Sequence, residues 1–311
     1  MRSAIVTGGA GFIGSHVADR LLADGARVVI ADDLSTGLRE RVPAEAELEP
    51  VSIVDFEALR RVAQAARPEA IFHLGAQSVV TVSVTDPWLD LEINVKGTLN
   101  VAQVAGELGI PVVFSSTGGA LYGDQAPMPT PETQAPKPLA PYGASKWAGE
   151  AYLITRAAAD RLPHGVLRLG NVYGPRQSPH GEAGVVAIFS HRLWSRQPAT
   201  LFGQGTATRD YVHVDDVVEA MVRATGIHGV FNISAGREVP VSEIFELVRG
   251  AAGVESEPQL APLREGELER SCLDPSLAAQ KLGWRAEVPL DRGIADTYRA
   301  LVAEFEAAER S

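Results

Sequence analysis

A glycine-rich turn near the N-terminus constrains the fold more than any other feature of the chain. The segment 7–14, TGGAGFIG, directly follows the short apolar run 4–7 and opens a helical pattern over 13–24. Glycines at every third position allow a tight turn, and they let a pyrophosphate approach the backbone at the positive end of the following helix. The pattern predicts a strand–turn–helix unit that binds a dinucleotide.

Strand-like and helix-like stretches alternate through the first half of the chain, which predicts an α/β fold with a Rossmann-like, doubly wound parallel sheet. The expected strands are 4–7, 27–31, 70–74, 111–115 and 165–169, and the expected helices are 13–24, 56–66, 91–108 and 141–160. After Gly170 the rhythm breaks into Gly- and Pro-rich segments. We expect a cofactor-binding domain over 1–172, to which 204–236 returns, and a smaller C-terminal α/β lobe from 173–203 and 237–311.

Two acidic residues, Asp32 and Asp33, follow the second expected strand. Asp32 lies roughly 20 residues beyond the glycine turn, where a carboxylate accepts both ribose hydroxyls of an adenosine. No arginine stands at this strand end to hold the extra phosphate of NADP. We therefore expect the cofactor to be NAD.

Tyr142 and Lys146 begin an expected helix, and their spacing of four puts both side chains on one face. A phenol with a pKa near ~10 is a poor base at neutral pH, but a neighbouring ammonium favours the phenolate. Ser115, Ser116 and Thr117 lie at the carboxyl end of the fourth expected strand, the edge where an open α/β sheet binds ligands. A hydroxyl there can hydrogen-bond an oxygen that is being oxidised.

The amino-acid composition disfavours several classes of partner and ligand. The formal net charge is −11, and such an acidic surface disfavours nucleic acid as a partner. The seven histidines show no metal-ligand spacing, so we expect no metal. No apolar run reaches the ~20 residues of a membrane-spanning helix. The chain enters its first expected strand directly after Met1 and has one cysteine, Cys272, so we expect a cytoplasmic protein without a signal peptide.

Further motifs carry a resemblance over essentially the whole chain. SSTGGALYG over 115–123, YGASK over 142–146, GNVYGP over 170–175, RDYVHVDD over 209–216 and LREG over 263–266 follow the glycine turn in this order. With them the chain resembles the extended short-chain dehydrogenase/reductase family, and within it the NAD-dependent UDP-glucose 4-epimerases of bacteria. The resemblance implies reversible C4 epimerisation of a UDP-hexose, either the glucose/galactose pair or the N-acetyl pair.

The resemblance also assigns roles to residues. Tyr142 would be the base, Lys146 would hold the nicotinamide ribose, and Thr117 would be the third catalytic residue, with Ser116 as its alternative. Asn94 would order the cofactor site, and Ser52-Ile53 stands where the family has the Asp-Ile pair that binds adenine. The implied NAD-binding residues are Gly8, Gly11, Phe12, Ile13, Gly14, Asp32, Asp33, Leu34, Ser35, Thr36, Gly37, Ser52, Ile53, Leu74, Gly75, Ala76, Gln77, Asn94, Ser115, Tyr142, Lys146 and Leu169.

For the UDP-sugar, the resemblance implies that Asn171, Arg209 and Arg264 hold the diphosphate and that Glu267 holds the uridine ribose. Ser271 would face C2 of the sugar, where a small residue leaves room for an N-acetyl group. The full set of implied substrate-binding residues is Thr117, Gly118, Gly119, Tyr142, Asn171, Arg176, Val185, Leu201, Phe202, Arg209, Arg264, Glu267 and Ser271.

Three other functions compete with this one. A dehydratase of the family carries carboxylates after the Ser/Thr motif, where this chain has Gly118-Gly119. A UDP-glucuronate 4-epimerase remains open because Arg176 could pair with a sugar carboxylate. A non-catalytic NAD sensor would commonly lack the tyrosine or the lysine, and both are present. The family often dimerises through the helices 91–108 and 141–160, so we expect a homodimer.

Overall fold

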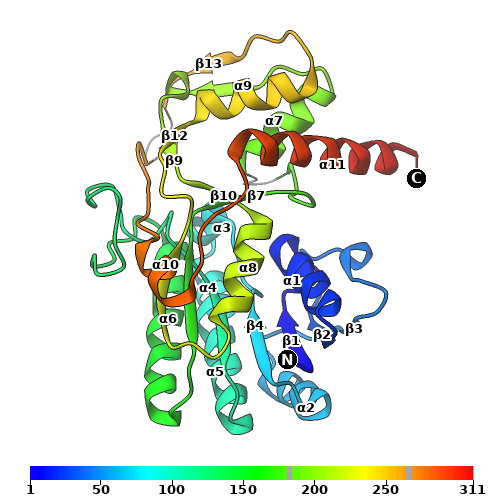
Figure 1. Cartoon of the computed structure of the whole chain (residues 1–311), viewed down its shortest axis with the longest axis vertical. Coiled ribbons are helices and arrows are strands. Elements are labelled where there is room, and N and C mark those ends of the chain that lie inside the picture. The colour runs from blue at the N-terminus through cyan, green and yellow to red at the C-terminus, as the bar shows by residue number, and fades with distance from the viewer. Residues whose placement is uncertain (181–183, 264–267, 311) are drawn as a thin grey trace.

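A seven-stranded sheet forms the centre of the protein (Figure 1), whose computed structural model describes residues 1–180, 184–263 and 268–310. The strand order is β11-β6-β5-β4-β1-β2-β3, and every neighbouring pair runs parallel. The expected Rossmann-like α/β class is confirmed. The strands are β1 (Ser3–Thr7), β2 (Arg27–Ala31), β3 (Glu47–Glu49), β4 (Ala70–His73), β5 (Val112–Thr117), β6 (Gly165–Leu169) and β11 (Gly229–Ile233).

Helices cover both faces of this sheet, which explains why its inner strands are nearly continuous apolar runs. Ala4 and Val6 of β1 point into one buried cluster, and Ile5 between them points into the other. The first cluster includes residues of α1 (Phe12–Ala23), α8 (Val214–Ala224) and α10 (Ser276–Leu282). The second includes residues of α2 (Phe56–Ala66), α5 (Gly97–Leu108) and α6 (Pro141–Asp160).

A second body with its own apolar cluster lies above the carboxyl edge of the sheet in Figure 1. It is built on α7 (Val185–Trp194), α9 (Val241–Ala252) and α11 (Leu290–Arg310). Two-stranded pairings accompany it, and each is two or three residues long. They join β7 (Asn171–Tyr173) to β10 (Tyr211–His213), β8 (Thr200–Phe202) to β13 (Gln259–Ala261), and β9 (Thr208–Arg209) to β12 (Val239–Pro240).

The chain crosses between the two bodies more than once. After it has formed α7 and β8 in the second body, the chain returns to the first: α8 packs on α1, and β11 becomes an edge strand of the main sheet beside β6. The short helix α10 also packs against the sheet, because Ala278, Leu282 and Trp284 belong to the cluster around α1 and α8. The segment 276–284 therefore packs against the main sheet, although it falls within the range 237–311 that the sequence assigns to the second lobe.

The predicted helix over 91–108 differs from the structure. Short helices α3 (Val80–Thr85) and α4 (Pro87–Leu91) precede a single wide turn, η2 (Glu92–Lys96), and α5 begins only at Gly97. Asp86 starts α4 by accepting a hydrogen bond from the Leu89 amide. Wide turns of this kind often mark functional sites. Two single turns of 3-10 helix, η1 (Arg39–Arg41) and η3 (Gly203–Gly205), complete the elements.

Candidate active site

The glycine turn joins β1 to α1 at the point where the strand order reverses. Gly8 has a φ of +69°, and a Cβ on it would lie 2.5 Å from the backbone nitrogen of Gly75 in the loop after β4. A Cβ on Gly14 would lie 2.1 Å from the Gly8 carbonyl oxygen. Gly11 caps α1 without a side chain. The two loops therefore touch, and the N-terminus of α1 stays open to a phosphate, which fits the pyrophosphate of NAD.

Asp32 stands at the end of β2 beside this turn. Its carboxylate accepts hydrogen bonds from the Ala10 and Leu34 amides, both at 2.9 Å. A carboxylate has about four acceptor sites, so both oxygens can still accept ribose hydroxyls. The next carboxylate, Asp33, is bonded to the Ser35 hydroxyl and the Ser52 hydroxyl. These hydrogen bonds outweigh burial and lower the pKa of Asp33.

Asn94 lies in the wide turn η2 and is buried. Its amide oxygen accepts from the Gln77 backbone N–H at 3.0 Å, and its amide nitrogen donates to the Gln77 carbonyl at 2.9 Å. The same nitrogen donates to Asp90 at 3.0 Å and to the Ser145 hydroxyl at 3.1 Å. One side chain thus ties the loop after β4 to α4 and α6. That arrangement would keep the implied cofactor loop, 74–77, in register with Tyr142.

Tyr142 lies in the first turn of α6, which begins at Pro141 and has no cap of its own. Ser83 of α3 supplies one, because its hydroxyl accepts a hydrogen bond from the Tyr142 amide at 3.0 Å. The phenol lies close enough to the hydroxyl of Thr117, at the end of β5, for that hydroxyl to favour the ionised form of Tyr142 and lower its pKa. That strand continues to Thr117, two residues beyond the predicted 111–115. The structure therefore brings Tyr142 and Thr117 together.

Burial dominates the electrostatics of this pair in the protein alone. It raises the pKa of Tyr142 to about 12, with the help of the Asp90 charge and against the neighbouring Thr117 hydroxyl. Burial also lowers the pKa of Lys146 to about 8, against the carboxylates of Glu150 and Asp90. The sequence predicts that the Lys146 ammonium lowers the pKa of Tyr142, but in the protein alone desolvation of the phenol dominates and Lys146 is not among the groups that shift that pKa. Forming the phenolate therefore needs further positive charge at the site.

Ser116, the alternative to Thr117, faces elsewhere. Its hydroxyl donates a short hydrogen bond to the Glu150 carboxylate, which also accepts from the Arg168 guanidinium at 2.7 Å. Residue 116 on β5 pairs with residue 168 on β6, so the two side chains reach α6 side by side. Sequence reasoning missed this buried ion pair. Glu150 was within reach of a spacing argument, since it follows Lys146 by one helical turn.

The residues implied for the sugar come from the ends of β5 and β6. A Cβ on Gly119 would meet only the Asn171 side-chain oxygen, at 3.6 Å, so Asn171 points toward this loop. A Cβ on Gly118 would lie 2.3 Å from a methyl group of Leu273. Glycine at 118 therefore has a packing reason: a side chain there would push the buried Leu273 side chain aside.

The implied diphosphate and sugar residues meet around Asp210, which is buried. Its carboxylate accepts from the Leu273 and Ala235 amides, both at 3.0 Å. Beside it, Arg209 donates to the Thr208 carbonyl, and that carbonyl also accepts from the Ser271 amide at 3.2 Å. The structure therefore places Ser271, which is buried, next to the strand that carries Arg209.

Other implied substrate residues lie further out. Val185 is the first residue of α7, and Leu201 and Phe202 belong to β8. The predicted positions of Arg264 and Glu267 lie outside the described residues.

Arg176 is engaged away from these groups. Its guanidinium pairs with Asp19 of α1 at 2.7 Å, and its amide donates to Glu304 of α11 at 3.1 Å. The residue has a φ of +65°, in the left-handed region. In this arrangement Arg176 connects α1 to α11 and does not lie among the residues around Tyr142.

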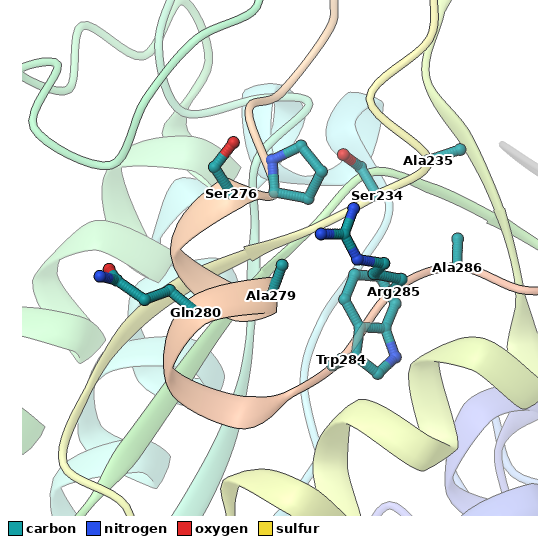
Figure 2. Close-up of a pocket in the computed structure, with 9 residues that line it drawn as sticks. Ser234, Ala235, Ser276, Ala279, Gln280, Trp284, Arg285 and Ala286 are labelled. Carbon is teal, nitrogen blue, oxygen red and sulfur yellow. The ribbon is translucent and has the colours of Figure 1, made fainter.

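A separate cavity of about 410 Å³ lies beyond the carboxyl end of β11 (Figure 2), with Arg285 and Trp284 on one side and α10 on another. It contains no implied site residue; the lining is Ser234, Ala235, Pro275, Ser276, Ala279, Gln280, Trp284, Arg285 and Ala286. Within the part of the chain that the structure describes, no cluster of acidic, histidine or cysteine side chains could hold a metal. No helix in that part has the length and apolar character to cross a bilayer.

Known proteins resemble the chain over nearly its full length. A UDP-glucose 4-epimerase of Mycolicibacterium smegmatis is 46% identical over 94% of this chain and 96% of that protein. The crystal structure of the Thermotoga maritima UDP-glucose 4-epimerase with UDP-glucose superposes with a TM-score of 0.95 at 43% identity, covering 97% of this chain and 99% of that one. The Thermus thermophilus enzyme in complex with NAD gives 0.90 at 42%, covering 96% and 98%.

Residues 4–233 match the description "NAD dependent epimerase/dehydratase family". The glycine turn, Asp32, and the pair of Tyr142 and Lys146 all lie within that span. With NAD as its cofactor, the chain belongs to the NAD-dependent epimerase/dehydratase family.

Proposed function

We propose that the protein interconverts UDP-glucose and UDP-galactose by epimerisation at C4, and that it also accepts the N-acetyl pair. The observation that carries the proposal is the close approach of the Tyr142 phenol to the Thr117 hydroxyl, with Lys146 one helical turn beyond, at the carboxyl edge of the sheet. The relatives named above, which are UDP-glucose 4-epimerases, support the choice of sugar.

The catalytic step assigned to these residues is a proton transfer. In its ionised form the Tyr142 oxygen takes the proton of the C4 hydroxyl, while the Thr117 hydroxyl donates a hydrogen bond to the same sugar oxygen. Lys146 contributes its positive charge, which favours the phenolate. The sugar then exists as a 4-ketone, turns about its link to the diphosphate, and receives the proton of Tyr142 back on its oxygen.

Redox chemistry at C4, the removal of a hydride and its return to the opposite face, is supplied by NAD when it is bound. The residues that would hold it are the glycine turn at its pyrophosphate, Asp32 at the adenosine ribose, and Lys146 at the nicotinamide ribose. The crowding of Gly8 and Gly14 against backbone supports this placement.

The substrate must be held firmly at one end and loosely at the other, because the sugar turns while the nucleotide stays. We assign the firm end to Asn171, Arg209, Arg264 and Glu267, around the diphosphate and uridine. Ser271 is assigned to the C2 side of the sugar, where its small side chain leaves space for an N-acetyl group.

The competing functions differ at single positions. A dehydratase needs a carboxylate after Thr117, and the contact between Gly118 and Leu273 leaves no room for one at residue 118. A UDP-glucuronate epimerase would use Arg176 on the sugar carboxylate, but the Arg176 guanidinium pairs with Asp19. The non-catalytic alternative has no support, because the tyrosine and the lysine that such proteins commonly lack are both present.

Three broader proposals accompany this function. We propose that residues 1–172 and 204–236 bind NAD, with the UDP-sugar held largely by 173–203 and 237–311. We further propose a homodimer through the helices of 91–108 and 141–160, which are α5 and α6; α6 leaves Trp147 44% exposed, and Trp88, in the preceding short helix α4, is 77% exposed. Sedimentation velocity that gives a monomer at micromolar concentration would reject the dimer. The lone, buried Cys272 fits a reducing compartment, and we place the protein in the cytoplasm.

One experiment separates the sugars. Purified protein is incubated separately with UDP-glucose, UDP-N-acetylglucosamine and UDP-glucuronate, without added cofactor, and the products are resolved by anion-exchange chromatography. The proposal predicts UDP-galactose as the main product and a measurable C4 epimer of the N-acetyl sugar. A C4 epimer of UDP-glucuronate alone, or a 4-keto product that accumulates, would contradict it.

A further inference from the structure

Lys146 is a buried charge in an environment that disfavours charge. Its side chain is 3% exposed, and its ammonium lies 4.5 Å from the centre of the Phe114 ring. A buried ammonium persists only where opposite charge or hydrogen bonds compensate for the lost water. Groups of the protein itself must therefore keep Lys146 protonated before any cofactor ribose reaches it.

The ionisable groups that face Lys146 come from several elements. Glu150 lies one turn further along α6, and Asp90 lies on α4. His73 of β4 is also near, but burial lowers its pKa to about 3, so it is neutral. Arg168 of β6 faces Glu150 from its other side. Two cations thus meet two carboxylates, and the buried group is close to neutral as a whole.

The Glu150 carboxylate is immobilised and cannot swing toward the lysine. Arg168 donates from Nη2 to Oε2 at 2.7 Å and from Nε to both oxygens at 3.1 Å. The Ser116 hydroxyl donates to Oε1. Glu150 itself is 1% exposed. Its charge is therefore held at a fixed place on the same helix face as Lys146 and Tyr142.

We propose that Glu150 is the positioning residue that keeps Lys146 charged through the reaction, with Arg168 and Ser116 holding its carboxylate in place. The inference deepens the proposed function and rests on the roles given there to Tyr142 and Lys146. The pKa of Lys146, about 8 with both carboxylates present, shows how little reserve exists at neutral pH. Neutral Lys146 could no longer favour the Tyr142 phenolate.

The chain makes this measurable, because it has only four lysines: Lys96, Lys137, Lys146 and Lys281. Protein labelled with ¹³C at the lysine ε-carbon is purified with whatever NAD it carries, and each resonance is followed against pH. The Lys146 resonance is the one missing in Lys146→Met. In Glu150→Gln its titration midpoint should fall by at least about one pH unit, a tenfold change in the ionisation constant. The alkaline limb of kcat should move with it, while KM for UDP-glucose stays unchanged.

Arg168→Lys is the matched control. It disturbs the same hydrogen bonds and lowers Tm, but it keeps both charges, so the midpoint should stay at the wild-type value. An unchanged midpoint in Glu150→Gln, or an equal shift in Arg168→Lys, would overturn the proposal.

Glu150→Gln leaves the Arg168 guanidinium without its partner. A second variant tests the same proposal if this loss makes Glu150→Gln fold poorly. Glu150→Gln/Arg168→Gln removes that stranded charge and should lower the midpoint in the same direction by a smaller amount. An unchanged midpoint in this double variant would equally overturn the proposal. Because the resonance is read without substrate, a wild-type protein that epimerises no UDP-sugar while Glu150→Gln still shifts Lys146 would reject the proposed function alone.

Discussion

The cofactor side and the sugar side of the site are built in different ways. On the cofactor side, buried side chains bond neighbouring elements directly, as Asn94 does with Gln77, Asp90 and Ser145. On the sugar side, the segment with Ser271 is held mainly by backbone hydrogen bonds to Thr208 and Thr130, with one buried carboxylate, Asp210, and it lies beside a strand pair of only two residues, β9 with β12. The difference suits a cycle in which NAD is regenerated in place while the sugar must turn.

The largest effect on activity should come from a substitution on the cofactor side. Tyr142→Phe keeps the ring and removes the group that moves the proton, so kcat should fall at least ~10²-fold while the fold and the NAD content stay the same. Initial rates with UDP-glucose and cofactor release on denaturation give the two numbers. The control is Tyr152→Phe on the exposed face of the same helix. Activity near wild type in Tyr142→Phe would mean that another group carries the proton.

A smaller, selective effect should come from the sugar side. Ser271→Tyr fills the space assigned to an N-acetyl group, so its turnover of UDP-N-acetylglucosamine should fall by ~10-fold or more, since 1.4 kcal/mol is tenfold. Turnover of UDP-glucose should be largely spared. Ser271→Ala, which keeps the side chain small, should retain both activities. If Ser271→Tyr lowers both activities equally, or neither, Ser271 does not face C2 of the sugar.

The smallest effect is expected at Arg176, which lies on neither the cofactor side nor the sugar side of the site. Arg176→Ala removes an exposed ion pair with Asp19 that is worth less than about 1 kcal/mol. Epimerisation of UDP-glucose should stay within about threefold of wild type. A KM for UDP-glucuronate that rises tenfold or more in this variant would place Arg176 on a sugar carboxylate and favour the competing epimerase.

Much of the sheet could be predicted, because most of its strands correspond to short apolar runs in the sequence. The runs 27–31 and 165–169 coincide with β2 and β6, since a strand buried on both faces is a nearly continuous apolar run, interrupted here only by Arg27 and Arg168. The charged edge strand Glu47–Glu49 carries no such signal. The wide turn over 92–96 was not predictable either, because its sequence is compatible with an ordinary helix and its widening accompanies the tertiary hydrogen bonds of Asn94.

The site residues also divide into those that the sequence alone indicates and those that only the structure reveals. Tyr142, Lys146 and Asp32 could be proposed from the sequence, because each stands at a recognisable spacing from a neighbouring motif residue along the chain. The choice between Ser116 and Thr117 needed the structure, since it depends on Glu150 and Arg168 holding Ser116. Arg168 could not be linked to Ser116 from the sequence, because the link is the pairing of β5 with β6.

The central claim is that C4 of a UDP-hexose loses a hydride and regains the same one within a single bound cycle. UDP-glucose with deuterium at C4 is incubated with the purified protein in ordinary water, without added NAD, and the UDP-galactose is examined by mass spectrometry and NMR. The account predicts UDP-galactose that retains the deuterium at C4. Product in which that deuterium has been exchanged for solvent hydrogen, or conversion that requires added cofactor in every turnover, would contradict it.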